Sequence, residues 1–193
     1  MVKDITQEIF EGQPKQETVA AFYQALAQAI TLWQRVEMAM LEIAEIAVGP
    51  KLPGALAASF HSLQHTQSQL HFTDAALRFW FLKHVPLSTE LQTEWVDNLF
   101  GKIIDKLQRR NELAHFSVMV IAQRKIEHEK IILTPAFTDT RYHTGKKRRQ
   151  YSINEIAMFA ENFLSLSRGL WDFRLRMIEL ETRLQAFRER SPH

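Results

Sequence analysis

Apolar positions recur at helical spacing along most of the chain. The first such stretch runs from about Thr18 to Val48, and the turn-forming pair Gly49-Pro50 ends it. The second covers roughly Leu56 to Lys83. Polar residues interrupt its apolar stripe at 64–69, which predicts a bend or a break there. We expect two long helices in the first half of the chain.

Two further helices are predicted in the second half. The third runs from Glu90 to about Ala114, and Thr89 before it fits a capping box with Gln92 in its first turn. The last opens with a second capping box, Ser152-Ile-Asn-Glu155, and continues to about residue 188. More than thirty helical residues span roughly 50 Å, which is longer than a four-helix core needs. Its distal half, 171–187, is either a dimer surface or a segment that bends back over the bundle or frays.

The pattern changes between the third and last helices. Two short β-branched runs, at 117–122 and 130–134, flank a charged stretch and predict a β-hairpin. A polar, basic loop follows at 138–150, and residues near 149–152 are a candidate third edge strand. The prediction is therefore a mainly α, up-down four-helix bundle with a small hairpin insertion.

Length fits one domain over residues 1–193. Within it we expect an N-terminal arm at 1–16, the hairpin and basic loop at 116–151, and a long C-terminal helix at 152–190. Apolar residues make up 46% of the chain, enough for a hydrophobic core. Glu42 and Glu45 break the richest apolar stretch, so no membrane span is expected.

Composition narrows the chemistry. The chain has no cysteine, which excludes disulfides, thiolate metal sites and thiol catalysis. Together with the absence of a signal-peptide pattern at the first residues, this predicts a cytoplasmic protein. The net charge is only +2, but basic residues gather at Lys146, Lys147, Arg148 and Arg149. This run is either a solvated loop or a segment that binds the RNA backbone.

Other candidate groups carry weaker signals. His61 and His65 have the spacing of a helical metal pair, but no matching third ligand accompanies them, so we expect neither a metal nor a cofactor. The four tryptophans lie at helical core spacings and are interpreted as packing residues: Trp33, Trp80, Trp95 and Trp171.

The sharpest feature is the run Arg110-Asn111-Glu112-Leu113-Ala114-His115 at the end of the third helix. A guanidinium matches phosphate oxygens, an imidazole transfers protons near neutral pH, and an amide can orient either partner. Asn111 and His115 share one helix face, whereas Arg110 and His115 diverge by about 140° on a regular helix. Arg109, six residues before His115, is a second candidate partner for the histidine. A structural role is the alternative, with Arg110 paired to a carboxylate and His115 at the helix C-terminus.

This Arg-Asn-x-x-Ala-His run resembles the signature of the HEPN superfamily, an arginine and polar residue followed by a histidine four to six positions on. Trp33-Gln-Arg-Val-Glu37 is similar to a Trp-x-x-x-Glu pattern in the first helix of uncharacterised members. The segment at 151–156, Tyr-Ser-Ile-Asn-Glu-Ile, resembles the start of their last helix. One departure is Phe116, where many members have glycine.

The resemblance implies a metal-independent endoribonuclease of toxin or antiviral-defence type. It also implies a homodimer that brings two copies of the motif together, RNA as the partner, and in some settings a cognate antitoxin. In that interpretation His115 acts as acid or base on the 2′-hydroxyl, Arg110 stabilises the phosphorane, and Asn111 orients one of them. Glu37 either pairs with Arg110, positions His115 or is an exposed helix-face carboxylate.

Two other interpretations remain open. The chain is alternatively a non-catalytic HEPN-like module for dimerisation or nucleotide binding, in which the same residues hold the helix end. The third interpretation is a plain helical bundle in which the motif is a coincidence.

Overall fold

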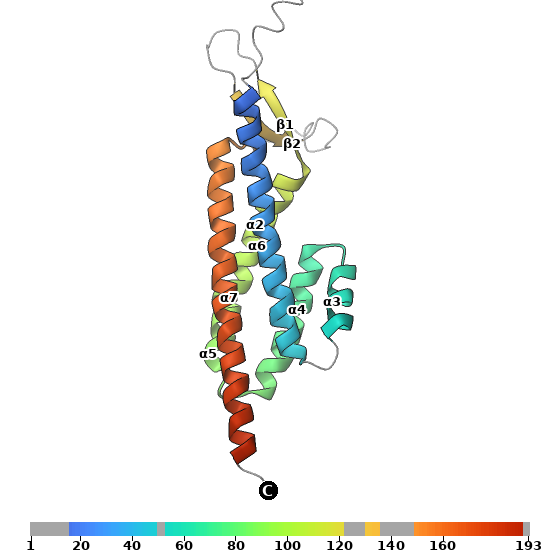
Figure 1. Ribbon diagram of the computed structural model, residues 1–193, viewed down its shortest axis with the longest axis vertical. Coiled ribbons are helices and arrows are strands. Elements are labelled where there is room, and N and C mark those ends of the chain that lie inside the picture. The colour runs from blue at the N-terminus through green and yellow to red at the C-terminus, as the bar shows by residue number, and fades with distance from the viewer. Residues whose placement is uncertain (1–15, 50–52, 122–129, 136–148, 191–193) are drawn as a thin grey trace, which may run out of the picture. The chain divides into compact units, whose positions relative to one another are not determined.

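The computed structural model describes residues 16–49, 53–121, 130–135 and 149–190, most of which are helical, so the mainly α prediction is confirmed. Figure 1 labels the elements. Their bounds are α2 (Gln16–Val48), α3 (Pro53–Ser62), α4 (Thr66–Lys83), α5 (Thr89–Glu94), the π-helical turn η1 (Trp95–Leu99), α6 (Phe100–His115), β1 (Phe116–Ile121), β2 (Lys130–Pro135) and α7 (Ile153–Arg190).

The chain forms two compact units, and their boundaries fall within α2, α6 and α7. The first unit comprises Met1–Thr31 and Arg109–Glu161, and the second comprises Leu32–Gln108 and Asn162–His193. The single domain stays a prediction.

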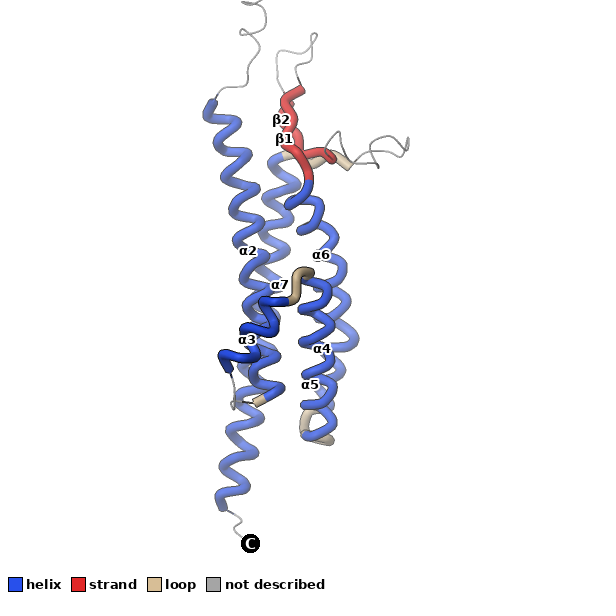
Figure 2. The backbone as a smooth tube through the Cα atoms, turned by 90° about the vertical axis from the view of Figure 1, so that its right-hand side faces the viewer, coloured by secondary structure: helices blue, strands red, loops and turns tan. Residues whose placement is uncertain are grey.

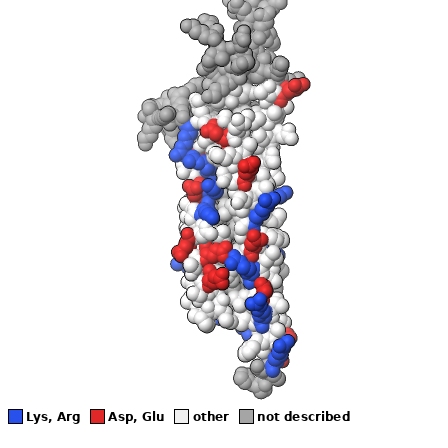
Figure 3. All heavy atoms as spheres, turned by 90° about the vertical axis from the view of Figure 1, so that its left-hand side faces the viewer, with Lys and Arg blue, Asp and Glu red and all other residues white. Residues whose placement is uncertain are grey.

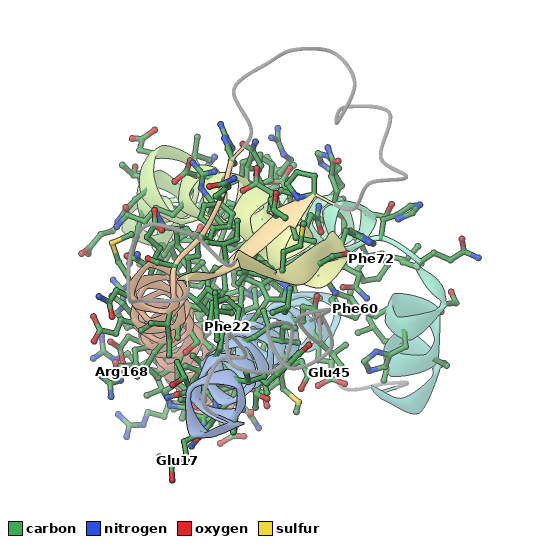
Figure 4. The ribbon with its side chains drawn as sticks, turned by 90° about the horizontal axis from the view of Figure 1, so that it is seen from above. Glu17, Phe22, Glu45, Phe60, Phe72 and Arg168 are labelled. Atoms are coloured by element: carbon green, nitrogen blue, oxygen red, sulfur yellow. The ribbon has the colours of Figure 1, made fainter. Side chains whose placement is uncertain are left out.

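The predicted hairpin belongs to the first unit and is confirmed. β1 and β2 pair antiparallel, with Phe116 opposite Pro135 and Ile121 opposite Lys130 (Figure 2). The predicted third edge strand is a single bridge, in which Leu133 and Tyr151 exchange two backbone hydrogen bonds of 2.9 Å. The first turns of α2 belong to the same unit, where Phe22 is buried and points inward while Glu17 points outward (Figure 4).

The two predicted capping boxes have different outcomes. At the start of α7, the Ser152 N–H and Oγ–H donate to Glu155 Oε2 at 2.7 and 2.8 Å, and the Glu155 N–H donates back to Ser152 Oγ at 3.4 Å. The box at Thr89 is wrong. Its hydroxyl donates to the Pro86 carbonyl at 2.7 Å. The Gln92 N–H that the box requires donates to the Ser88 carbonyl at 2.9 Å, because α5 begins at Thr89 itself and Ser88 precedes it.

The second and third predicted helices are each made of more than one element in the structure. The second predicted helix is broken at residues 63–65, between α3 and α4, where the polar interruption predicted a break. The third continues from α5 through η1 into α6, and the sequence interpretation did not include this π turn. No helix among the described residues combines the length and apolarity that a membrane crossing needs.

Three tryptophans pack inside the second unit as predicted. Trp33 meets Phe163 edge-on at 5.1 Å between ring centroids, and Trp95 lies 5.7 Å from Phe173. Each buried indole N–H donates to a carboxylate: Trp33 to Glu37 at 2.8 Å, Trp80 to Glu181 at 2.7 Å and Trp95 to Asp74 at 3.0 Å. The polar edge of each ring is therefore satisfied inside an apolar core.

Trp171 does not follow this pattern. Its side chain is 46% exposed on α7, with the Arg174 guanidinium 4.6 Å from the ring centroid. The packing interpretation is wrong for this residue, because it lies on the outward side of a helix whose inward side is already filled by Leu170 and Phe173. Acidic and basic side chains are interspersed over the face in Figure 3, in keeping with the small net charge.

Candidate active site at the end of α6

The motif occupies the last two turns of α6. The helix ends at His115 and β1 begins at the next residue, so the predicted helix ending is confirmed. The Asn111 and His115 side chains are exposed, and Arg110 is half-buried. Arg110 Nη1 donates to Asn111 Oδ1 at 3.2 Å. Arg110, Asn111 and His115 are therefore within reach of solvent, in the first unit.

Helical geometry keeps the arginine and the histidine apart. Residues 110 and 115 both lie within α6, so their side chains leave the helix axis about 140° apart. Asn111 and His115 lie one turn apart on a common face. The Arg110 side chain therefore leaves α6 in a different direction from Asn111 and His115, and its guanidinium reaches round to the Asn111 amide oxygen.

Glu112, within the motif, is the centre of a hydrogen-bonded network. Its residue is 9% exposed, and its carboxylate accepts from Arg109 Nη1 at 3.0 Å and from Arg149 Nη1 at 2.7 Å. The Tyr151 hydroxyl donates to the same carboxylate, and Arg109 Nη1 donates to the Tyr151 oxygen at 3.0 Å. A buried carboxylate with these donors is satisfied as a charged group.

The network shifts the ionisation of its members. Burial by itself raises the pKa of Glu112, but the hydrogen bonds from Tyr151, Arg109 and Arg149 outweigh it and hold that pKa below its usual value. Burial and the neighbouring Glu112 carboxylate raise the pKa of Tyr151. Glu112 is thus a carboxylate and Tyr151 a neutral donor at neutral pH.

Aromatic packing holds the same residues in place. The Phe116 ring stacks on Tyr151 with centroids 5.9 Å apart and planes 15° from parallel. Phe159 meets the Tyr151 ring edge-on at 5.1 Å. Phe116, the departure from the HEPN pattern, therefore has a structural role, since it joins the start of β1 to the segment that precedes α7.

The structure distributes the other predicted residues differently. Arg109 is a partner of Glu112, and so is Arg149, whose side chain remains 49% exposed. Lys146, Lys147 and Arg148 lie outside the described residues. Glu37 belongs to the second unit, where it accepts from Trp33 and from Thr66 at 2.8 Å each. Its predicted role beside Arg110 or His115 stays a prediction.

Sequence reasoning did not assign roles to Glu112 and Tyr151. The i,i+3 spacing of Arg109 and Glu112 is visible in the sequence and favours a pair. The contact with Tyr151 joins residues thirty-nine positions apart, which no helical pattern indicates. Only the fold brings them together.

No group of three or more His, Cys, Asp or Glu side chains among residues 16–49, 53–121, 130–135 and 149–190 is placed to hold a metal ion. His61 and His65 do not share a helix, because α3 ends at Ser62 and α4 begins at Thr66. Their spacing therefore does not place them on one face.

Comparisons of the chain with models of protein families, with curated proteins and with solved structures give no match in any of the three. The resemblance to the HEPN superfamily therefore depends on the residues of the motif and on the two shorter similarities in the helices.

Proposed function

We propose that this protein is a metal-independent endoribonuclease of the HEPN type, with Arg110, Asn111 and His115 as its catalytic residues. The observation that carries the proposal is the placement of an exposed imidazole and amide on one face of a helix end. Glu112 ties that helix end to Arg149 and Tyr151, so the side chains leave from an anchored backbone.

The chemistry assigned to these residues is transesterification. His115 takes the proton from a ribose 2′-hydroxyl, and O2′ attacks the adjacent phosphorus. Arg110 stabilises the charge that builds on the phosphorane oxygens, and Asn111 orients the imidazole or the phosphate. The P–O5′ bond breaks, O5′ takes a proton from the imidazolium or from water, and a 2′,3′-cyclic phosphate remains. DNA lacks the nucleophile and is not cut.

A second copy of the chain completes the site in this proposal. Because Arg110 and His115 diverge on one helix, the arginine of one chain is joined with the histidine of the other. α7 offers an apolar face for such a contact, since Trp171, Leu175 and Ile178 recur at helical spacing and are 46%, 47% and 37% exposed. We extend the proposal to a four-helix HEPN bundle that dimerises, acts on RNA in the cytoplasm and is restrained by a cognate antitoxin.

One observation favours the non-catalytic alternative. Arg110 donates to the neighbouring Asn111, and Arg109 and Glu112 are engaged in the network, so much of the motif already serves the helix end. In that case the protein is a helical dimerisation or nucleotide-binding module.

Incubation of the purified protein with RNA in EDTA separates these functions. We expect cleavage by the wild type, with 2′,3′-cyclic phosphate ends, and a loss of at least about 100-fold in His115→Ala and Arg110→Ala. His65→Ala is the matched control, because His65 is exposed and precedes α4. Equal cleavage by all four proteins overturns the assignment, and a folded but inert wild type favours the non-catalytic module.

A further inference from the structure

A groove between α6 and α7 lies in the second unit, whereas the residues assigned to catalysis belong to the first. Its volume is about 290 Å³, and its lining includes Leu99, Lys102, Lys106, Asn162, Ser165 and Gly169. All of these residues belong to the second unit. We propose that this groove binds a phosphate group, and that the phosphate belongs to a nucleic-acid strand.

The polar lining has the chemistry of a phosphate site. Lys102 and Lys106 are one helical turn apart on α6, so both ammonium groups reach the same groove. Lys106 Nζ lies 3.2 Å from Asp105 Oδ2, but that carboxylate side chain is 75% exposed and holds the lysine only weakly. Across the groove, α7 contributes the Asn162 amide and the Ser165 hydroxyl. Two cations, an amide and a hydroxyl together suit the oxygens of a phosphate.

Two backbone features shape this groove. The π-helical turn η1 ends at Leu99, which lines it, and such turns are frequent at functional sites. Gly169 faces Leu99 from the interior of α7, and a Cβ atom there would lie 3.8 Å from Leu99 Cδ2, an ordinary contact. Packing therefore does not require glycine. In a helix interior glycine is less favourable than alanine, and here a larger side chain would project toward Leu99, which also lines the groove.

The size of the groove limits what enters it. Pockets for small ligands range from about 300 to 1,000 Å³, so this one accommodates a phosphate with an attached sugar rather than a dinucleotide. The phosphate chemistry follows from the groove alone. The assignment to an RNA strand rests on the proposed function.

The test measures binding without cleavage. Three probes are used with the full chain: a 2′-O-methyl oligoribonucleotide, which lacks the nucleophile, adenosine monophosphate and inorganic phosphate. The double variant Lys102→Gln/Lys106→Gln removes both charges, Gly169→Leu fills the groove, and Lys83→Gln at the end of α4 is the control. Fluorescence anisotropy follows the oligonucleotide, and calorimetry follows the two small ligands.

We expect the double variant to bind the oligonucleotide at least about 10-fold more weakly. The slope of log binding constant against log salt concentration should become about 1.4 less steep, because each of two lost phosphate contacts contributes about 0.7. Gly169→Leu should weaken binding without changing charge, and Lys83→Gln should bind as the wild type does. Lysine-dependent binding of only the two small ligands would keep the phosphate site and refute the strand. Unchanged binding of all probes by the double variant overturns the proposal.

The two proposals fail separately. RNA cleavage by the wild type together with unchanged binding by Lys102→Gln/Lys106→Gln refutes the groove and leaves the nuclease. Lysine-dependent binding of the oligonucleotide by a protein that cleaves no RNA refutes the nuclease and leaves the groove.

Discussion

Glu112 is the residue through which the charged end of α6 is bonded to the rest of the first unit. Its carboxylate receives two guanidinium groups and a phenol, and it is buried enough that losing these donors would leave an expensive charge. The network uses Arg109 and leaves His115 exposed. At the scale of single residues, anchoring and proposed chemistry are thus assigned to different side chains of one motif.

Tyr151→Phe tests the anchoring role. The substitution removes the hydroxyl that serves Glu112 and Arg109 but keeps the ring that packs on Phe116 and Phe159. We expect the free energy of unfolding in urea to fall by about 1–3 kcal/mol, since the lost hydrogen bonds involve charged groups. Tyr23→Phe is the control, because Tyr23 is 52% exposed on α2. Equal effects of the two variants would contradict the network.

The lowered pKa of Glu112 gives a pH dependence with a definite sign. In the folded state the carboxylate is favoured, so its contribution to stability is fully present above the ordinary value of 4.5 and is lost as pH falls through the lower folded pKa. We expect the difference in unfolding free energy between wild type and Glu112→Gln to be constant from neutral pH to about 5 and to shrink below it. A difference that does not change with pH down to 3 would argue against a charged Glu112.

Elements were predictable where their determinants are local. The first and last helices and the hairpin follow from apolar spacing, β-branched runs and one capping box, and the structure confirms them. The π turn also corresponds to a pattern in the sequence. Five buried apolar residues recur at strict intervals of four from α5 into α6, namely Leu91, Trp95, Leu99, Ile103 and Leu107. Such spacing drifts by about 40° per step on an α-helix, and one wider turn offsets part of that drift.

The candidate site was predictable only in part. The motif and its position at a helix end follow from the sequence, whereas the Glu112–Tyr151 contact depends on how the segment before α7 returns to α6. Thr89 is not a cap because the turn before it lets α5 begin one residue earlier than the pattern predicts, and the Gln92 N–H then donates to the Ser88 carbonyl. Local rules predict which residues are available, and the tertiary fold decides their partners.

Ser152→Ala tests the confirmed capping box of α7. The substitution removes two side-chain hydrogen bonds with Glu155 and leaves the one from the Ser152 N–H. We expect a loss of about 1 kcal/mol in thermal or urea unfolding. Ser68→Ala in α4 is exposed, and there alanine should be neutral or slightly stabilising. A Ser152→Ala protein as stable as the wild type would refute the cap.

At the scale of the whole molecule, the proposed nuclease requires two chains. The divergence of Arg110 and His115 on one helix, and the exposed apolar face of α7, both favour a site completed by a second copy. This arrangement makes the activity of one variant depend on its partner. A monomeric enzyme with the same residues would not behave in this way.

Mixing two inactive variants tests this claim most directly. Arg110→Ala and His115→Ala are each assayed alone on RNA in EDTA, then unfolded together, refolded and assayed as a mixture. If the arginine and the histidine come from different chains, half of the dimers are mixed and each has one intact site, so activity should return to about a quarter of the wild-type value. A mixture that stays as inactive as its components, beside an active and equally refolded wild type, would contradict the shared site.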